Sequence, residues 1–178
     1  IRSSGCSAVS IGLVPTPLLY FATYATDYAS GVMLTASHNP ANYNGLKIVF
    51  NQNSLAGNQI QKIRTRIEND QLRTGSGKFS ELEVDRSYID DICTRIQLSK
   101  PLKVVTDCGN AVPGQIAPTL FKEFGCDVHP IFCEIDGTFP NHHPDPTIPE
   151  NLAALASTVP EKNASFRIPS VGYATPSG

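Results

Sequence analysis

A serine beside a histidine, Ser37 and His38, lies in residues 35–40, directly after the short apolar run 31–34. We call residues 35–40 the serine loop. Serine supplies a hydroxyl nucleophile, and histidine supplies a group that titrates near neutral pH. An Asn-Pro dipeptide closes the segment and favours a turn that holds the loop in shape. These residue types could therefore support group-transfer chemistry on the serine hydroxyl.

Three interpretations of the serine loop compete. It is a turn with local side-chain caps, the active site of a serine hydrolase, or a loop whose serine carries and transfers a phosphoryl group. The hydrolase is disfavoured, because neighbouring residues in a strand or turn point apart and His38 is then poorly placed as a base for Ser37. The G-x-S-x-G elbow is also missing. A phosphoryl carrier needs a rigid loop, backbone N–H groups, cations and a nearby acid or base.

The spacing of apolar residues predicts the strands around the serine loop. The continuous apolar run within 31–36 is typical of a strand that is covered on both faces. Residues 44–50 alternate, which predicts a second strand with Leu46 and Phe50 on one face and Lys47 on the other. Ligands of open α/β sheets bind at the carboxyl ends of strands, where the first of these strands delivers the serine loop.

Helical spacing predicts three helices before residue 100, at 15–28, 58–69 and 85–98. Pro17 suits the first turn of the first helix, and Asn58 suits the cap of the second. Between the second and third helices, a Gly/Ser turn and a short strand-like piece are expected.

A second unit begins after a Lys-Pro pair at residues 100–101. Its pattern is strand 102–107, helix 115–125 and strand 126–136, with a glycine-rich turn between the first two. Short links of this kind indicate a βαβ unit, so we expect a parallel strand pair with a right-handed crossover. From residue 157 onward, prolines and small residues without periodicity predict coil.

The composition excludes several classes of protein. Forty per cent hydrophobic and 17% charged residues describe a globular chain rather than a disordered one. The net charge of −2 gives no electrostatic reason to expect nucleic acid or an anionic membrane as partner. No apolar run approaches the roughly 20 residues that a membrane span needs.

The start of the chain shows no signal-peptide pattern and no initiator Met, so the natural amino terminus is expected to be missing. The chain has five cysteines, an odd number without a C-x-x-C pair. This count favours buried structural thiols in a reducing cytoplasm over a disulfide framework or a zinc site.

An ordered series of motifs along the chain helps to choose among these interpretations of the serine loop. The motif TASHNP followed by YNGLK resembles the phosphoserine signature of the α-D-phosphohexomutases, and the chain is similar to their bacterial phosphomannomutase/phosphoglucomutase branch. The resemblance runs from about residue 11 to 155. Its blocks are VPTP (14–17), GVMLTASHNP (31–40), NGLKIV (44–49), VVTDCGNAVPG (104–114) and DGTFPNHHPDP (136–146). The last block favours the mannose/glucose branch over the phosphoglucosamine mutases.

The resemblance implies an enzyme, an isomerase that interconverts hexose 1-phosphates and 6-phosphates by intramolecular phosphoryl transfer. Ser37 would be the phosphoryl carrier, and a hexose 1,6-bisphosphate the intermediate and activator. A phosphoserine carries about −1.5 to −2 charges near neutral pH and needs a cation beside it. Family members use Mg²⁺, bound by one oxygen of the phosphoserine, here Ser37, and by three aspartates.

The resemblance also implies roles for two neighbours of Ser37. Lys47 matches a lysine near the phosphoserine that is a candidate general acid or base, and desolvation would lower its pKa toward that use. The alternative is an exposed strand lysine. His38 is expected to contact the phosphoserine, whereas Asn39 and Asn44 would shape the loop.

Two other groups of residues are weaker candidates. The glycine-rich turn at 108–114 matches neither the Walker pattern nor G-x-G-x-x-G, so we interpret it as a strand–helix turn. Asp136, His142, His143 and Asp145 could suggest a metal site, but the prolines between them favour a non-helical bound segment.

The chain departs from the family near its end. A metal loop of the type D-G-D-G-D is expected soon after residue 159, yet no aspartate follows Asp145. We expect a frameshift or truncation after about residue 163 or 164, testable by translating the gene in its other two frames. Without those aspartates, the chain alone is expected to have little or no mutase activity. The alternative is a non-catalytic, vestigial or sugar-phosphate-binding fragment.

The predicted fold is α/β, with three-layer α/β/α domains of the phosphohexomutase type, a mixed sheet and an incomplete chain. Residues 1–97 would form domain I without its amino-terminal part, and residues 98–178 a partial domain II with a divergent tail. The expected partner is a small phosphosugar substrate, without nucleic acid or membrane, bound by a monomeric cytoplasmic protein. The residues that would choose between mannose and glucose are not in the chain.

Overall fold

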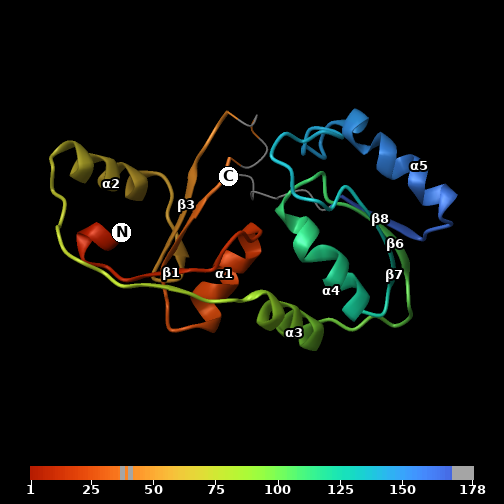
Figure 1. Ribbon diagram of the computed structural model, residues 1–178, viewed down its shortest axis with the longest axis horizontal. Coiled ribbons are helices and arrows are strands. Elements are labelled where there is room, and N and C mark those ends of the chain that lie inside the picture. Colours follow the sequence, from red (N-terminus) through yellow and green to blue (C-terminus); the bar gives the residue numbers. More distant parts are fainter. Residues whose placement is uncertain (37–38, 40–41, 170–178) are drawn as a thin grey trace.

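The computed structural model describes residues 1–36, 39 and 42–169, and Figure 1 shows an N-terminal half beside a C-terminal half. The strands are β1 (Ala8–Ser10), β2 (Gly31–Leu34), β3 (Leu46–Phe50), β4 (Asn53–Ser54), β5 (Phe79–Glu81), β6 (Lys103–Asp107), β7 (Asp127–Ile131) and β8 (Phe166–Pro169). The α-helices are α1 (Thr16–Ala25), α2 (Asn58–Glu68), α3 (Asp85–Arg95), α4 (Ala117–Glu123) and α5 (Ala153–Glu161). Single 3₁₀ turns cover Arg2–Ser4, Val112–Gln115 and Pro149–Leu152.

The N-terminal half contains two small sheets. β1 pairs in parallel with β5, while β2 and β4 pair antiparallel with the two edges of β3. Lys47 lies opposite Met33 in the β2–β3 ladder. The predicted α/β class is confirmed, since helices accompany both parallel and antiparallel sheets.

The prediction that the strand at 31–36 is covered on both faces is wrong. In β2, Val32 is 46% exposed and Leu34 is 70% exposed, and both point to the same side of the strand. The predicted alternation of β3 is confirmed, but its apolar face is the open one, with Leu46 60% and Phe50 63% exposed. Helix α1 packs on the other face, where Val49 is buried. A sheet covered on one side exposes every second residue, whatever its polarity.

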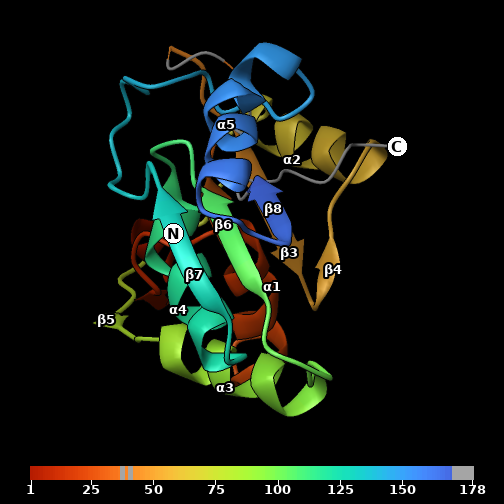
Figure 2. The ribbon, with the colours of Figure 1, turned by 90° about the vertical axis from the view of Figure 1, so that its right-hand side faces the viewer.

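The C-terminal half is a three-layer unit around β6. Figure 2 shows β6 between β7 and β8, and both neighbours are parallel to it. Helix α4 packs on β7, while α5 packs on β6 and β8, and the two helices lie on opposite faces of the sheet in Figures 1 and 2. Four successive residues of β6, from Val104 to Asp107, are therefore buried. The predicted parallel pairing of the βαβ unit is confirmed.

The prediction of coil from residue 157 onward is wrong within the described residues. Helix α5 continues to Glu161, with Pro160 in its last turn, and β8 follows. The β8 ladder with β6 pairs Phe166 with Val104 and Ile168 with Thr106. The free edge of β6 supplies backbone partners for this segment, and such tertiary pairing overrides local composition.

The predicted helices near 15–28, 58–69 and 85–98 are confirmed, with shorter ends. The proposed cap of the second is wrong, because Gly57 holds the N-cap position of α2 and makes no side-chain cap bond. The main hydrophobic cluster joins both halves, since Leu18 of α1 and Ile89 of α3 pack with Ile116. Among the described helices, none combines the length and apolar character of a membrane span.

Candidate functional site

Two of the predicted site residues, Ser37 and His38, lie outside the described residues, and so does any metal contact through Ser37. The described residues that flank them form a turn. The backbone N–H and the side-chain Nδ2 of Asn39 both donate to the carbonyl oxygen of Ala36, at 3.1 and 3.0 Å. The prediction that Asn39 shapes the loop is supported by these two bonds.

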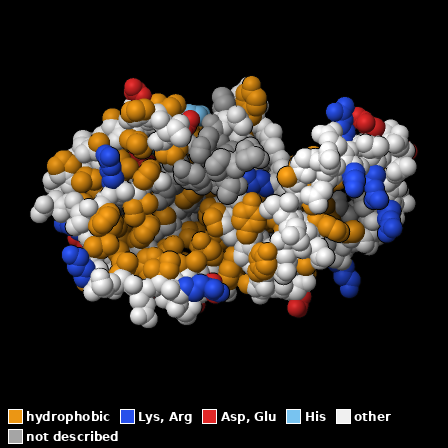
Figure 3. Space-filling model, turned by 180° about the vertical axis from the view of Figure 1, so that it is seen from behind, with side chains coloured by type: hydrophobic (Ala, Val, Ile, Leu, Met, Phe, Trp, Pro, Cys, Tyr) orange, Lys and Arg blue, Asp and Glu red, His pale blue; other side chains and the backbone are white. Residues whose placement is uncertain are grey.

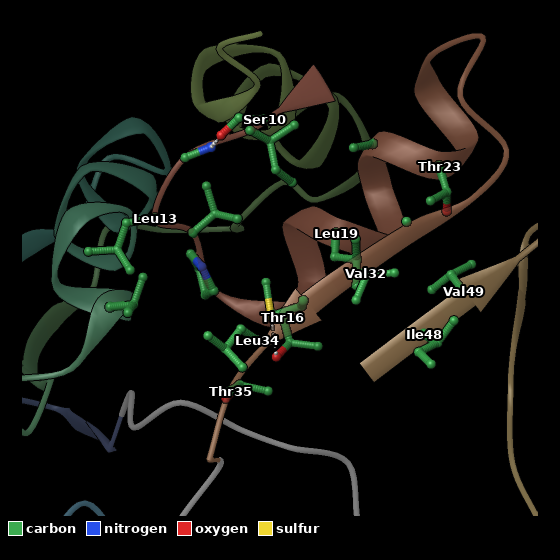
Figure 4. A pocket seen from close by; sticks show the side chains of 18 of the residues that line it. Ser10, Leu13, Thr16, Leu19, Thr23, Val32, Leu34, Thr35, Ile48 and Val49 are labelled. Carbon is green, nitrogen blue, oxygen red and sulfur yellow. Dashed lines mark hydrogen bonds between the residues drawn. The ribbon is translucent and has the colours of Figure 1, made fainter. Parts of the chain in front are cut away.

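Lys47 lies on the α1 side of its sheet and is half-buried. Its ammonium donates to the hydroxyl oxygen of Thr16 at 3.4 Å, and that hydroxyl lies 3.4 Å from the sulfur of Met33. Figure 4 shows Thr16 beside the end of β2, close to Leu34 and Thr35. The structure thus brings Lys47 to the strand end that leads into the serine loop, which the sequence predicted.

Burial lowers the pKa of Lys47 below the usual range of a lysine. Loss of water disfavours the charged ammonium, so the amine becomes available at a lower pH. Thr16 is the first residue of α1, and the positive end of a helix dipole acts in the same direction. A lysine with this environment is suited to accept and return a proton.

A cavity of about 1020 Å³ opens beside this site. Its wall includes Ala36 and Asn39, which flank Ser37 and His38, and also Thr16, to which Lys47 is hydrogen-bonded. Lys47 itself is not part of the wall. The C-terminal half closes the other side with the segments that follow β6 and β7, including residues 110–113. The cavity is mostly apolar, and polar groups lie near the serine loop.

Sequence reasoning missed a buried pair on the C-terminal side. The Nε2 of His142 lies 3.1 Å from both carboxylate oxygens of Asp107, and only 11% and 2% of these side chains are exposed. The Nδ1 of His142 lies 3.0 Å from the carbonyl of His143. Nearby, Asn141 donates to the side chain of Asn110 at 2.7 Å. These contacts hold the segment around His142 against the carboxyl end of β6. The available signals were Asp107 at the end of a predicted strand and His142, which the sequence suggested only as a weak metal candidate.

The weaker metal hypothesis receives no support in the described part of the chain. Asp136 accepts bonds from the backbone and hydroxyl of Thr138, and Asp145 accepts the same two bonds from Thr147. His142 is paired with Asp107. Among residues 1–36, 39 and 42–169, no group of three or more His, Cys, Asp or Glu side chains is placed to hold a metal ion.

Models of known protein families match both halves of the chain. The domain I model of phosphoglucomutase/phosphomannomutase, an alpha/beta/alpha domain, matches residues 1–74, and the domain II model matches residues 86–170. The chain belongs to the phosphoglucomutase/phosphomannomutase family. The predicted resemblance is confirmed, while the expected boundary at 97–98 and the divergent tail after about residue 164 stay predictions.

Individual relatives agree with this family. The chain is 50% identical over 162 residues to a phosphomannomutase/phosphoglucomutase of Pseudomonas aeruginosa, which covers 91% of this chain and 35% of that protein. It is 40% identical over 168 residues to a phosphoglucomutase of Neisseria gonorrhoeae, covering 93% and 36%. A crystal structure of a family protein from Burkholderia thailandensis superposes with a TM-score of 0.87 at 40% identity, covering 92% and 37%. The chain therefore spans about a third of the length of these relatives.

Proposed function

We propose that this chain is the phosphoserine-carrying part of a phosphohexomutase that interconverts mannose or glucose 1-phosphates and 6-phosphates. The main observation behind the proposal is which residues line the cavity. Ala36 and Asn39, which flank Ser37 and His38, line one large cavity together with Thr16, the partner of Lys47. Membership of the family supports the same reaction.

In the proposed reaction, the phosphoryl group on Ser37 passes to the free hydroxyl of a hexose monophosphate. The P–O bond to Ser37 breaks as the sugar oxygen bonds to phosphorus, giving a hexose 1,6-bisphosphate. The other phosphate of this intermediate then returns to Ser37. Lys47, with its lowered pKa, relays the proton of the attacking sugar hydroxyl to the departing oxygen of Ser37, and in the second half-reaction it relays a proton from the Ser37 hydroxyl to the departing sugar oxygen. His38 contacts the phosphoserine.

Mg²⁺ belongs to the proposal for the whole protein, where it would stabilise charge on the transferring phosphoryl group. The residues of this chain do not fit a resident Mg²⁺, since no acidic cluster of the needed kind is present in the described part and no aspartate follows Asp145. We therefore assign no step of this chain to the metal. The purified 178-residue chain should show little or no mutase turnover in a coupled assay, and family-like turnover would overturn this expectation.

The substrate would be a small phosphosugar, with hexose 1,6-bisphosphate as activator. We also propose a monomeric protein in the cytoplasm. The rival is a non-catalytic fragment, either vestigial or sugar-phosphate-binding.

A graft tests the proposal against this rival. The segment of the Pseudomonas aeruginosa relative that aligns with this chain is replaced by this chain's residues, which restores the remaining two thirds of the length. We expect the graft to convert hexose 1-phosphate to 6-phosphate, and Ser37→Ala to reduce turnover to background. Ser80→Ala, in an exposed strand, is the matched control and should keep the rate of the graft. A folded graft without turnover, or turnover that survives Ser37→Ala, would favour the vestigial fragment or another carrier.

A further inference from the structure

Two cysteine sulfurs meet at the carboxyl end of the β7–β6–β8 sheet. The Sγ atoms of Cys108 and Cys133 lie 3.0 Å apart, and both thiols are free. Cys108 directly follows β6 and is fully buried, whereas Cys133 lies two residues after β7 and is half-buried. The other three cysteines form no such pair in the described part of the chain.

The strand register makes this pair suitable for a covalent bond. Asp107 lies opposite Ile131 in the parallel ladder, and the backbone N–H of Cys108 donates to the carbonyl of Ile131 at 3.1 Å. Cys133 is therefore one residue beyond the position directly across from Cys108. The two Sγ atoms, 3.0 Å apart, need to approach by only about 1 Å to reach the length of an S–S bond.

The backbone around the pair is held in place. Phe132, between β7 and Cys133, has a φ of 52°, a left-handed conformation that turns the chain back toward β6. Gly114 approaches the carbonyl of Cys133 so closely that a Cβ there would clash with its oxygen. Both segments then continue into the cavity wall, through Asn110 on one side and Ile135 on the other.

We propose that Cys108 and Cys133 form a peroxide-oxidisable dithiol, a modification site that links the two cavity-lining segments of the C-terminal half. The sulfur of Cys133 attacks one oxygen of a hydroperoxide, the O–O bond breaks, and a sulfenic acid and one water (or alcohol) form. The sulfur of Cys108 then attacks the sulfur of Cys133, the S–O bond breaks, and the leaving hydroxide takes the thiol proton as water. The two thiols lose two electrons and two protons, and the peroxide gains them.

The environment sets the order of the two steps. The hydrogen bond with Cys108 lowers the pKa of Cys133, whereas the hydrogen bond with Cys133 and burial raise the pKa of Cys108. The carboxylate of Asp107 opposes the thiolate at both positions. Cys133 is also the more exposed of the two. It is therefore the sulfur that meets the oxidant, and Cys108 is the sulfur that resolves it.

Thiol counting on the 178-residue chain tests the proposal. The protein is treated with hydrogen peroxide, quenched, alkylated with N-ethylmaleimide under denaturing conditions and weighed intact. We expect two of the five thiols to become unreactive together with a loss of two hydrogens, and dithiothreitol to restore them. Trypsin separates Cys108 from Cys133 at Lys122, and cleavage at Asp127 separates Cys126 from Cys133, so the linked peptides identify the pair.

Cysteine-to-serine variants test which thiols are oxidised. Cys133→Ser and Cys108→Ser should each abolish the loss of two thiols, while Cys126→Ser, at another buried cysteine, should leave it intact. Far-ultraviolet circular dichroism checks that each variant is folded. A link between other cysteines would overturn the proposal. It would also fail if Cys133 oxidises to sulfinic acid without a link, or if all five thiols stay reactive at peroxide levels that oxidise an added free thiol.

Discussion

The central strands of the two halves of the molecule are buried to different extents. β6 has helices on both faces and strands on both edges, and its residues from Val104 to Asp107 are buried. β2 has a helix on one face only, and every second residue is exposed. Figure 3 shows one side of the molecule, where hydrophobic side chains gather over the left and the middle of the view. Stability should therefore depend on the C-terminal half, whereas the predicted chemistry lies in the N-terminal half.

The largest effect on stability should come from the layer that covers β6. Leu155 of α5 is fully buried, and Leu155→Ala should lower the free energy of unfolding by about 2–5 kcal/mol. Leu34→Ala is the matched change on the open face of β2 and should cost less than about 0.5 kcal/mol. Urea denaturation of the two variants measures the difference. Equal losses would show that the open face of β2 is covered in solution.

A smaller loss is expected at the carboxyl end of β6. His142→Ala leaves the buried carboxylate of Asp107 without its side-chain partner, which should cost about 1–3 kcal/mol. Asp136→Ala lies in the same segment but removes an exposed carboxylate that caps Thr138, so its effect should be clearly smaller. Denaturation midpoints of the two variants give the comparison. If His142→Ala is no worse than Asp136→Ala, the buried pair does not hold this segment.

The pH dependence of stability tests Lys47 in the N-terminal half. Its pKa is lowered in the folded chain relative to its ordinary value of 10.5. Between these two pKa values the unfolded chain binds more protons, so the Lys47 contribution to stability rises with pH across that window. Below the folded pKa, burial of the ammonium destabilises the fold.

Lys47→Met should therefore raise stability at neutral pH and reduce the rise toward pH 10.5, the ordinary pKa of lysine. Lys62→Met, in the helix α2 without buried residues, is the control and should change neither. Thermal unfolding midpoints across the alkaline range supply the measurement. A pH profile of Lys47→Met that matches the parent chain would contradict the lowered pKa.

Local patterns allowed much of the fold to be predicted. Helices α1 and α3 and the parallel pair β6–β7 follow from residue spacing and short links, which act within one element or between neighbours. The open face of β2 and the pairing of β8 could not be predicted in this way. Burial of a face depends on what else packs there, and the edge that accepts β8 lies about 60 residues earlier in the sequence.

In the candidate site too, local features could be predicted from the sequence and long-range contacts could not. Lys47 was predicted from its place in an alternating strand and from the family resemblance. Its partner Thr16 lies 31 residues away, and the Asp107–His142 pair spans 35 residues. Contacts over such separations leave no spacing pattern in a single sequence, and only the folded chain reveals them.

We propose that the hydroxyl of Ser37 carries phosphate between the two ends of a hexose. The most direct measurement is phosphosite mapping of the grafted protein after incubation with hexose 1,6-bisphosphate and Mg²⁺. We expect one phosphoryl group, on Ser37, that is lost when hexose monophosphate is added in excess. A graft that turns over substrate with its phosphoryl group on another residue, or with none, would contradict it.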